Sequence, residues 1–309
     1  MAVLNGQGGF YEAVMKLAEI ESDVPLTMGQ KGVFASFFGP DLPNLIGVVI
    51  LTSLGTWGLP QMVHKFYAIK DEQAVKTGTI VSTFFAIIIS GGCYFLGGFG
   101  RLFDCDAIYK ADGSVAYDSI VPQMLSTLPD VLIGIVIVLV LSASMSTLSS
   151  LVLTSSSTLT LDFLKETVVK NMTEKTQLIL MRILIAVFII LSVVLALNPP
   201  TFIAQLMGVS WGGLAGAFLA PFMYGLYSKK ITKASVWASY IVGVGFTVAN
   251  LFLGFIKSPI NAGAITMLLG LIVVPVVSLI TPKMNKEYVD DIFTCYDQKV
   301  EVSKKRSLE

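Results

Sequence analysis

Thirty consecutive residues, from Val131 to Thr160, contain no charged side chain. About 20 apolar residues are enough for a helix to cross the hydrocarbon core of a bilayer, so this stretch predicts a membrane-spanning helix. Its second half is unusual, because twelve hydroxyl-bearing residues lie between Ser142 and Thr160. A helix in lipid satisfies its own backbone polar groups, and these hydroxyls are therefore available for other contacts.

The rest of the chain has the same apolar character. Of its 309 residues 54% are hydrophobic and 14% are charged, and the mean hydropathy is +0.76. A soluble domain carries about 25% charged residues. The sequence therefore predicts an all-α polytopic membrane protein whose partner is the lipid bilayer. Its seven transmembrane helices are expected at residues 42–64, 77–100, 131–161, 179–197, 201–228, 234–256 and 258–281.

Charge placement predicts how the chain is oriented. Sixteen of the 21 basic residues follow or flank the first, third, fifth and seventh apolar segments, on one side of the membrane. By the positive-inside rule that side is cytoplasmic. We therefore expect a multi-pass protein of the cell membrane with an extracellular connection at 1–41, a transmembrane bundle at 42–281 and a cytoplasmic tail at 282–309. An acidic extracellular segment of this length, with nothing before it to carry it across, predicts that further helices precede Met1 in the natural chain.

The hydroxyl residues of the third segment form a stripe. Ala143, Ser146, Thr147, Ser150 and Thr154 recur at helical spacing on one face, which we expect to face the protein interior. Neutral oxygens suit a monovalent cation, because a divalent cation would need carboxylates to offset its desolvation. The hydroxyls of Ser146 and Thr147 lie one turn from the Ala143 carbonyl. Together the two hydroxyls and the carbonyl would supply three oxygens. The alternative is that these hydroxyls bond to a carbonyl four residues back or to a neighbouring helix.

Several function classes lack the residues that they need. No Asp, Glu, Lys or Arg lies within the seven apolar cores. An intramembrane enzyme would require an acid, a base or a metal ligand there, so the sequence predicts neither an enzyme nor a bound cofactor, and no nucleic-acid partner. Proton coupling would usually need a titratable group too, and His64, beside Lys65 at a helix end, is better interpreted as an interfacial structural residue.

The first apolar segment is predicted to be interrupted. Two glycines and Pro60 weaken its second half, and Pro60 cannot donate the hydrogen bond to residue 56. Interrupted helices mark substrate sites in transporters, since irregular backbone is tolerated where it lines a cavity. A plain proline kink with no ligand is the alternative. The substrate-lining residues predicted on this basis are Thr52, Thr56, Trp57, Gly58, Pro60 and Gln61.

Small residues are frequent in the fifth and sixth segments, from Gly208 to Ala220 and from Ala234 to Gly245. Close backbone approach drives helix association in lipid, where no hydrophobic force acts between helices. Helix packing is therefore the favoured explanation for these residues.

Two motifs carry a family resemblance. The first interrupts the first segment and consists of Gly58, Leu59 and Pro60 followed by Lys65, Phe66 and Ala68. The second lies in the hydroxyl-rich helix and consists of Ala143, Met145, Ser146, Thr147, Leu148, Ser150, Ser155 and Ser156. With these motifs the chain resembles the sodium/solute symporter family, which includes sodium–proline, sodium–pantothenate and sodium–glucose symporters. The likeness extends through essentially all seven segments.

The resemblance implies a LeuT-type fold of two inverted repeats, of which this chain would hold the second repeat plus two trailing helices. It implies that the Ala143 carbonyl and the Ser146 and Thr147 hydroxyls help to bind the coupling sodium. The remaining ligands would come from the first helix of the first repeat, in the N-terminal half. The family commonly has a glutamine before the motif proline, and this chain has Leu59 there. Thr52 and Thr56 replace an aromatic residue near the break. Because of these departures, the resemblance does not predict which substrate the chain binds.

Two functional hypotheses follow. In the first, the chain is the C-terminal part of a sodium-coupled symporter for a small solute, with sodium at the stripe and solute at the break. In the second, it is a non-transporting membrane scaffold or partner subunit whose helices assemble with another chain.

Overall fold

The structure is a computed structural model that describes residues 2–63, 69, 71–103, 108–109, 115–170, 172–197, 199 and 203–297. It is all-α, and the only β pairing among these residues is an isolated bridge between Tyr109 and Val115. The chain divides into two compact units, which we describe separately. Unit 1 comprises residues 1–10 and 103–202, and unit 2 comprises residues 11–102 and 203–309.

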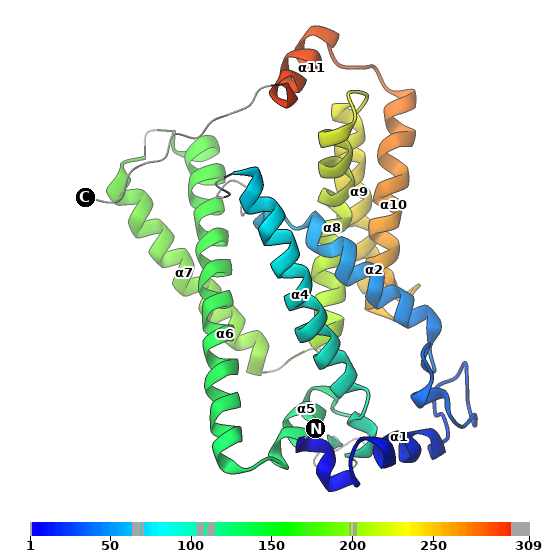
Figure 1. The fold of residues 1–309 in the computed structure, drawn as a ribbon. Helices are drawn as coiled ribbons and strands as arrows, with labels where there is room; N and C mark the ends of the chain where they lie inside the picture. Colours follow the sequence, from blue (N-terminus) through cyan, green and yellow to red (C-terminus); the bar gives the residue numbers. More distant parts are fainter. Residues whose placement is uncertain are drawn as a thin grey trace. The chain divides into compact units, whose positions relative to one another are not determined.

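Six helices of the described residues are long and apolar enough to cross a membrane. They coincide with the second to seventh predicted segments to within a few residues, except that the first and the third of the six begin five residues earlier than predicted, at Glu72 and Glu174. The helices are α4 (Glu72–Gly97), α6 (Asp130–Ser157), α7 (Glu174–Leu197), α8 (Ile203–Tyr227), α9 (Lys233–Leu253) and α10 (Pro259–Ile280) (Figure 1). This confirms the prediction of a polytopic helical membrane protein.

The first predicted segment is interrupted as expected, but its main helix is shorter than a full span. Helix α2 (Leu42–Gly58) is apolar but has only 17 residues, and a short α3 (Pro60–Val63) follows it. The rest of the chain contributes shorter helices that the hydropathy pattern did not define as spans. These are α1 (Phe10–Glu19), α5 (Tyr117–Ser126) and α11 (Lys286–Phe293).

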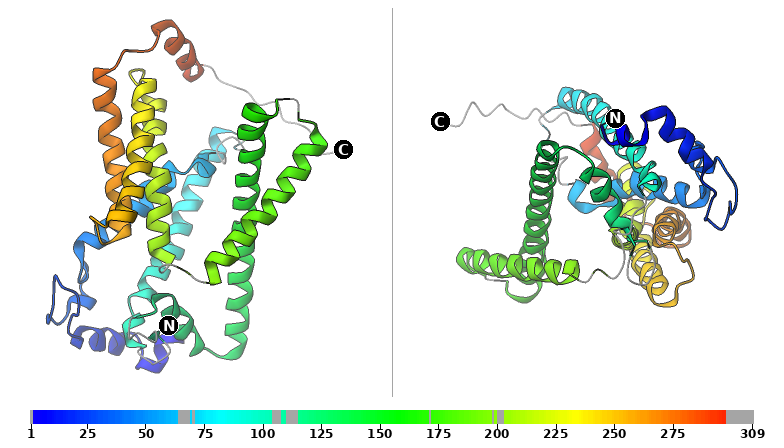
Figure 2. Two further views of the ribbon diagram at one scale, coloured as in Figure 1. Left: turned by 180° about the vertical axis from the view of Figure 1, so that it is seen from behind. Right: turned by 90° about the horizontal axis from the view of Figure 1, so that it is seen from below.

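In unit 1, α6 and α7 run in opposite directions and contact each other (Figure 1 and, from behind, Figure 2). Helix α6 continues without a break into a π-helix, Thr158–Val168, before the chain turns back. The buried residues of α6 are Val152 and Ser156, near its end, and Thr160 is buried in the π-helix.

Unit 2 is organised around α8, α9 and α10, which pack on one another, while α2 crosses α8 and α10 (Figure 1). A core of Leu51, Ala215, Leu219, Ile260 and Met267 joins α2, α8 and α10. Asp41 caps the start of α2, since its side chain accepts a hydrogen bond from the Asn44 amide at 3.0 Å.

Small residues allow the helices of unit 2 to approach closely, as predicted. A Cβ added to Gly212 would lie 2.6 Å from the Cα of Gly263, so the backbones of α8 and α10 are in direct contact there. A Cβ on Gly243 of α9 would lie 2.5 Å from the amide nitrogen of Ala217 on α8. Glycine is required at such crossings because any side chain would hold the helices apart.

Two prolines interrupt the hydrogen-bond ladders of unit 2, and a neighbouring helix compensates for each. Pro221 cannot donate to the carbonyl of Ala217, which instead accepts from the Ser239 hydroxyl at 3.0 Å. Pro275 likewise frees the carbonyl of Leu271, which accepts from the Tyr224 hydroxyl at 3.0 Å. An unsatisfied carbonyl in hydrocarbon costs several kcal/mol, so these two hydroxyls stabilise the bundle.

We expect Tyr224→Phe to lower the free energy of unfolding by about 1 kcal/mol, because it leaves the Leu271 carbonyl without a donor while keeping the aromatic ring. The matched control is Tyr240→Phe. Tyr240 packs against Phe218, with ring centroids 5.0 Å apart, and its hydroxyl has no partner among the described residues. Unfolding by a denaturing detergent, followed by circular dichroism, measures both. Equal destabilisation of the two variants would contradict the assignment.

Candidate functional site

The hydroxyls of α6 fall into two groups. Four of them donate to carbonyls of their own helix: Ser149 to Met145 at 2.7 Å, Ser150 to Thr147 at 2.9 Å, Thr154 to Ser150 at 2.8 Å and Ser156 to Leu153 at 3.0 Å. The other six make no hydrogen bond within the described part of the chain: Ser142, Ser144, Ser146, Thr147, Ser155 and Ser157. Back-bonding within the helix therefore accounts for Ser150 and Thr154 of the stripe and leaves Ser146 and Thr147 available.

The surroundings of the stripe differ from the prediction. Ala143, Ser146, Thr147, Ser150 and Thr154 are all exposed rather than turned to the interior. The buried residues of α6, Val152 and Ser156, lie near its end and on another face, and the stripe is left uncovered. The three predicted sodium ligands thus lie together on one open face.

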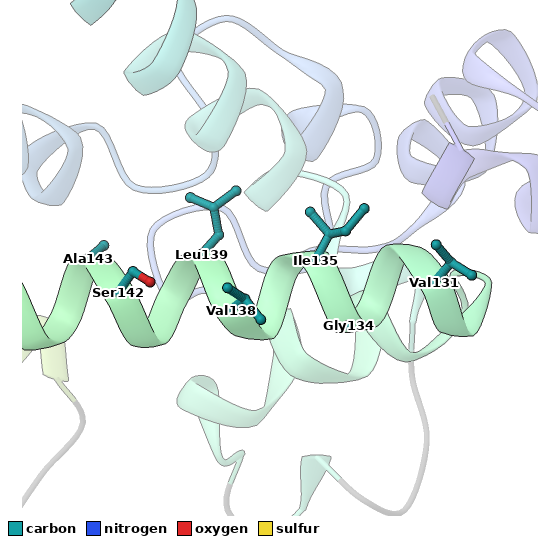
Figure 3. Close-up of a pocket in the computed structure, with 7 residues that line it drawn as sticks. All are labelled: Val131, Gly134, Ile135, Val138, Leu139, Ser142 and Ala143. Atoms are coloured by element: carbon teal, nitrogen blue, oxygen red, sulfur yellow. The ribbon is translucent and has the colours of Figure 1, made fainter.

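A shallow apolar groove of about 610 Å³ runs along α6 up to this face (Figure 3). Its walls are side chains of α6 such as Val131, Ile135 and Leu139, and it ends at Ser142 and Ala143. Figure 3 shows these side chains projecting from a single helix. No charged residue of α6 lies between Asp130 and its end, so the environment of the stripe is electrically neutral. Such a surface suits neutral solutes or a monovalent ion better than a divalent one.

Sequence reasoning missed Thr160. It lies four residues after Ser156 on the same helical face, is fully buried, and its Oγ1 has no hydrogen-bond partner among the described residues. The signal that could have identified it is the i, i+4 spacing from the serine of the second motif. A π-helix begins at Thr158 and shifts the following residues relative to an ideal α-helix, which the sequence pattern does not reveal.

The predicted interruption of the first segment is present. Helix α2 ends at Gly58, Leu59 is extended with φ −87° and ψ 116°, and a new helical turn starts at Pro60. Since proline has no N–H, the Thr56 carbonyl loses its helical donor. At the prolines of α8 and α10, the freed carbonyls accept from the hydroxyls of Ser239 and Tyr224. The described residues supply no such donor for the Thr56 carbonyl.

The six predicted substrate-lining residues occupy different environments. The hydroxyl of Thr52 donates to Val48 at 2.7 Å and that of Thr56 to Ser53 at 3.1 Å, so neither is free. Trp57 is 55% exposed. Gly58 is buried, and a Cβ there would lie 2.7 Å from Ala215 Cβ. Pro60 and Gln61 are half-buried.

The stripe belongs to unit 1 and the break to unit 2. The motif residues Lys65, Phe66 and Ala68, together with His64, lie outside the described residues. No group of three or more His, Cys, Asp or Glu that could hold a metal occurs in the described part.

Two carboxylates of unit 2 have a perturbed pKa. A hydrogen bond from Arg101 lowers the pKa of Asp23, with the two groups 2.8 Å apart. A hydrogen bond from Lys229 lowers the pKa of Asp290, at 2.7 Å. Both pairs are exposed and contribute little to stability. They join segments outside the apolar helices and are not part of the stripe or the break.

Comparison with known proteins identifies relatives. A sequence model of the sodium:solute symporter family matches residues 1–243. The sodium/pantothenate symporter of Haemophilus influenzae is 30% identical over 242 residues, which cover 77% of this chain and 47% of the relative. The osmoregulated proline transporter of Bacillus subtilis is 27% identical, covering 75% and 47%. A sodium/proline symporter of Staphylococcus aureus is 26% identical, covering 79% and 49%. The chain thus spans about half the length of these relatives, and no solved structure matches it significantly.

Proposed function

Because this chain belongs to the sodium:solute symporter family, we propose that it carries part of the machinery for sodium-coupled symport of a small solute. The observation that supports this most directly is the pair of free hydroxyls, Ser146 and Thr147, on an uncharged helix. Sodium would bind to these hydroxyls and to the Ala143 carbonyl. Binding would favour the conformation that accepts the solute, since a ligand shifts an equilibrium towards the state that it binds better.

The solute would bind at the break after Gly58. The Thr56 carbonyl supports this placement, because its helical donor is absent and it is free to accept a hydrogen bond from a ligand. Gln61 is half-buried just beyond the break and offers an amide for the same purpose. The relatives are named as transporters of pantothenate or proline. We propose that the solute of this chain is a small molecule of the same kind. The orientation is likewise proposed, with the lysine-rich ends of α8 and α10 in the cytoplasm.

The test is sodium-driven uptake. The part of the Haemophilus symporter that precedes its matched region is fused to Met1, and the fusion is reconstituted in liposomes. We expect uptake of radiolabelled pantothenate or proline to rise at least tenfold when an inward sodium gradient is imposed, and not with potassium. The 309-residue chain reconstituted by itself should give no such uptake, because its stripe supplies only three sodium ligands.

The same assay tests the solute placement. Gln61→Ala in the fusion is expected to raise the KM for the solute and to leave the sodium dependence unchanged. Uptake by the fusion that is equal in sodium and potassium would contradict sodium coupling. An unaltered KM in Gln61→Ala would remove this residue from the solute site.

A further inference from the structure

A second cavity lies in unit 2, at the end of the bundle where α9 turns back into α10 (the lower end of these helices in Figure 1). It has a volume of about 320 Å³ and lies between three helices, with walls that include Val209 of α8, Leu251 of α9 and Ala262 of α10. The connecting turn contributes Lys257, the only charged residue that lines it. Neither the stripe nor the break takes part in this cleft.

The two neutral polar side chains that line the cleft, Thr247 and Asn250, already have hydrogen-bond partners within the fold. The buried side chain of Asn250 donates to the Ile256 carbonyl at 3.2 Å and accepts from the Ile256 amide at 2.8 Å, which fixes the turn. The Thr247 hydroxyl donates to the Gly243 carbonyl at 2.9 Å. A ligand in the cleft would therefore meet apolar walls and one charged side chain, Lys257.

Lys257 is exposed and takes part in no ion pair within the described residues. The sequence from 203 to 286 contains no Asp or Glu that could pair with it. The neighbouring Ser258 hydroxyl donates to Asn44 at 3.0 Å, which brings the start of α2 near. The acid of that region, Asp41, accepts from the Asn44 amide as the cap of α2 and lies beyond ion-pair distance of Lys257. The ammonium group is thus free to bind an anion from outside the chain.

We propose that this cleft binds one anionic phospholipid, with the phosphate of its headgroup on Lys257 and an acyl chain along the apolar walls. The ligand must combine a negative charge with a long apolar part, because the cleft combines one unpaired cation with apolar surface. Phe252 and Phe255 are 81% and 58% exposed, follow the lining residues Leu251 and Gly254 in the chain, and add apolar surface beside the cleft. The proposal does not depend on sodium coupling.

Native mass spectrometry of the purified 309-residue chain tests this site. The protein is mixed with equal amounts of phosphatidylglycerol and phosphatidylcholine that carry the same acyl chains. We expect the single-lipid adduct of phosphatidylglycerol to exceed that of phosphatidylcholine by about fivefold, since one lysine near anionic lipid contributes about 1 kcal/mol. Lys257→Gln should abolish this preference, and Lys257→Arg should keep it.

Two further variants make the test specific. Lys230→Gln removes an exposed lysine from the opposite end of the bundle and should leave the preference unchanged. Leu251→Trp places a bulky ring at an exposed wall position and should reduce the adducts of both lipids. The proposal is overturned if the wild type shows no selective adduct, or if Lys257→Gln keeps the preference. It is also overturned if Lys230→Gln loses the preference to the same extent. Thermal unfolding of each variant in detergent verifies that it is folded.

Discussion

Replacing Gly243 by alanine is expected to force α9 away from α8 and to lower the free energy of unfolding by about 3 kcal/mol. The new Cβ would lie 2.5 Å from the Ala217 nitrogen and 2.6 Å from the Gly216 carbonyl carbon. Both atoms belong to the backbone and cannot rotate away. The displacement would also lengthen the bond from Ser239 to the Ala217 carbonyl, one turn away on the same face of α9. Fluorescence- or dichroism-detected unfolding in mixed detergent micelles measures the loss.

Gly245→Ala is the matched control for this prediction. It is the same substitution in the same helix, two residues further on, where an added Cβ meets no atom within 4 Å. Alanine has the higher helix propensity by about 1 kcal/mol, so this variant should be as stable as the wild type or slightly more stable. If the two variants unfold alike, the close crossing of α8 and α9 is not what stabilises unit 2.

Thr147→Ala is expected to abolish sodium-stimulated uptake in the fusion protein described above, lowering it at least a hundredfold at low sodium concentration. The variant removes one of the two stripe hydroxyls that do not donate to a carbonyl of their own helix. A sodium ion that loses a ligand must either remain undercoordinated or take up a water, and its affinity falls. Uptake measured against sodium concentration gives the affinity, and Thr147→Ser, which retains the hydroxyl, should restore it to near the original value.

Thr154→Ala is the control, since it is the same substitution two turns along α6 at a hydroxyl that already bonds to Ser150. We expect its sodium dependence to equal that of the wild type. A Thr147→Ala protein whose uptake retains the wild-type sodium affinity would exclude Thr147 from the ion site, and Ser146→Ala would then decide whether the stripe is involved at all.

Helix positions were predictable from the sequence where apolar length alone determines them. Helices α6, α8, α9 and α10 match their predicted segments because each is a long apolar stretch with no charged residue in its interior. Helix α7 begins five residues before its predicted segment, because its first turn includes Glu174 and Lys175. Helix α5 was missed because its ten residues are too few and too polar to resemble a span. Helix α11 was missed for the same reason, since it has only eight residues and four of them are charged.

The candidate sites were predictable in composition but not in environment. The pattern located the interruption at Pro60 and the hydroxyls of α6. It could not distinguish the free hydroxyls of Ser146 and Thr147 from those of Ser150 and Thr154, because that depends on the rotamer of each side chain. It also could not predict that Gly58 packs against Ala215, a contact between residues more than 150 positions apart.

The proline-freed carbonyls of unit 2 have a consequence for the order in which the chain is synthesised. The donor for Leu271, Tyr224, lies earlier in the sequence, so it is already in the membrane when α10 arrives. The donor for Ala217, Ser239, lies in the next helix, so α8 enters the bilayer with an unpaired carbonyl that only α9 can satisfy. Biosynthesis therefore favours insertion of α8 and α9 together as a hairpin, for which the five-residue turn between them is short enough. Helix α10 can join that hairpin afterwards.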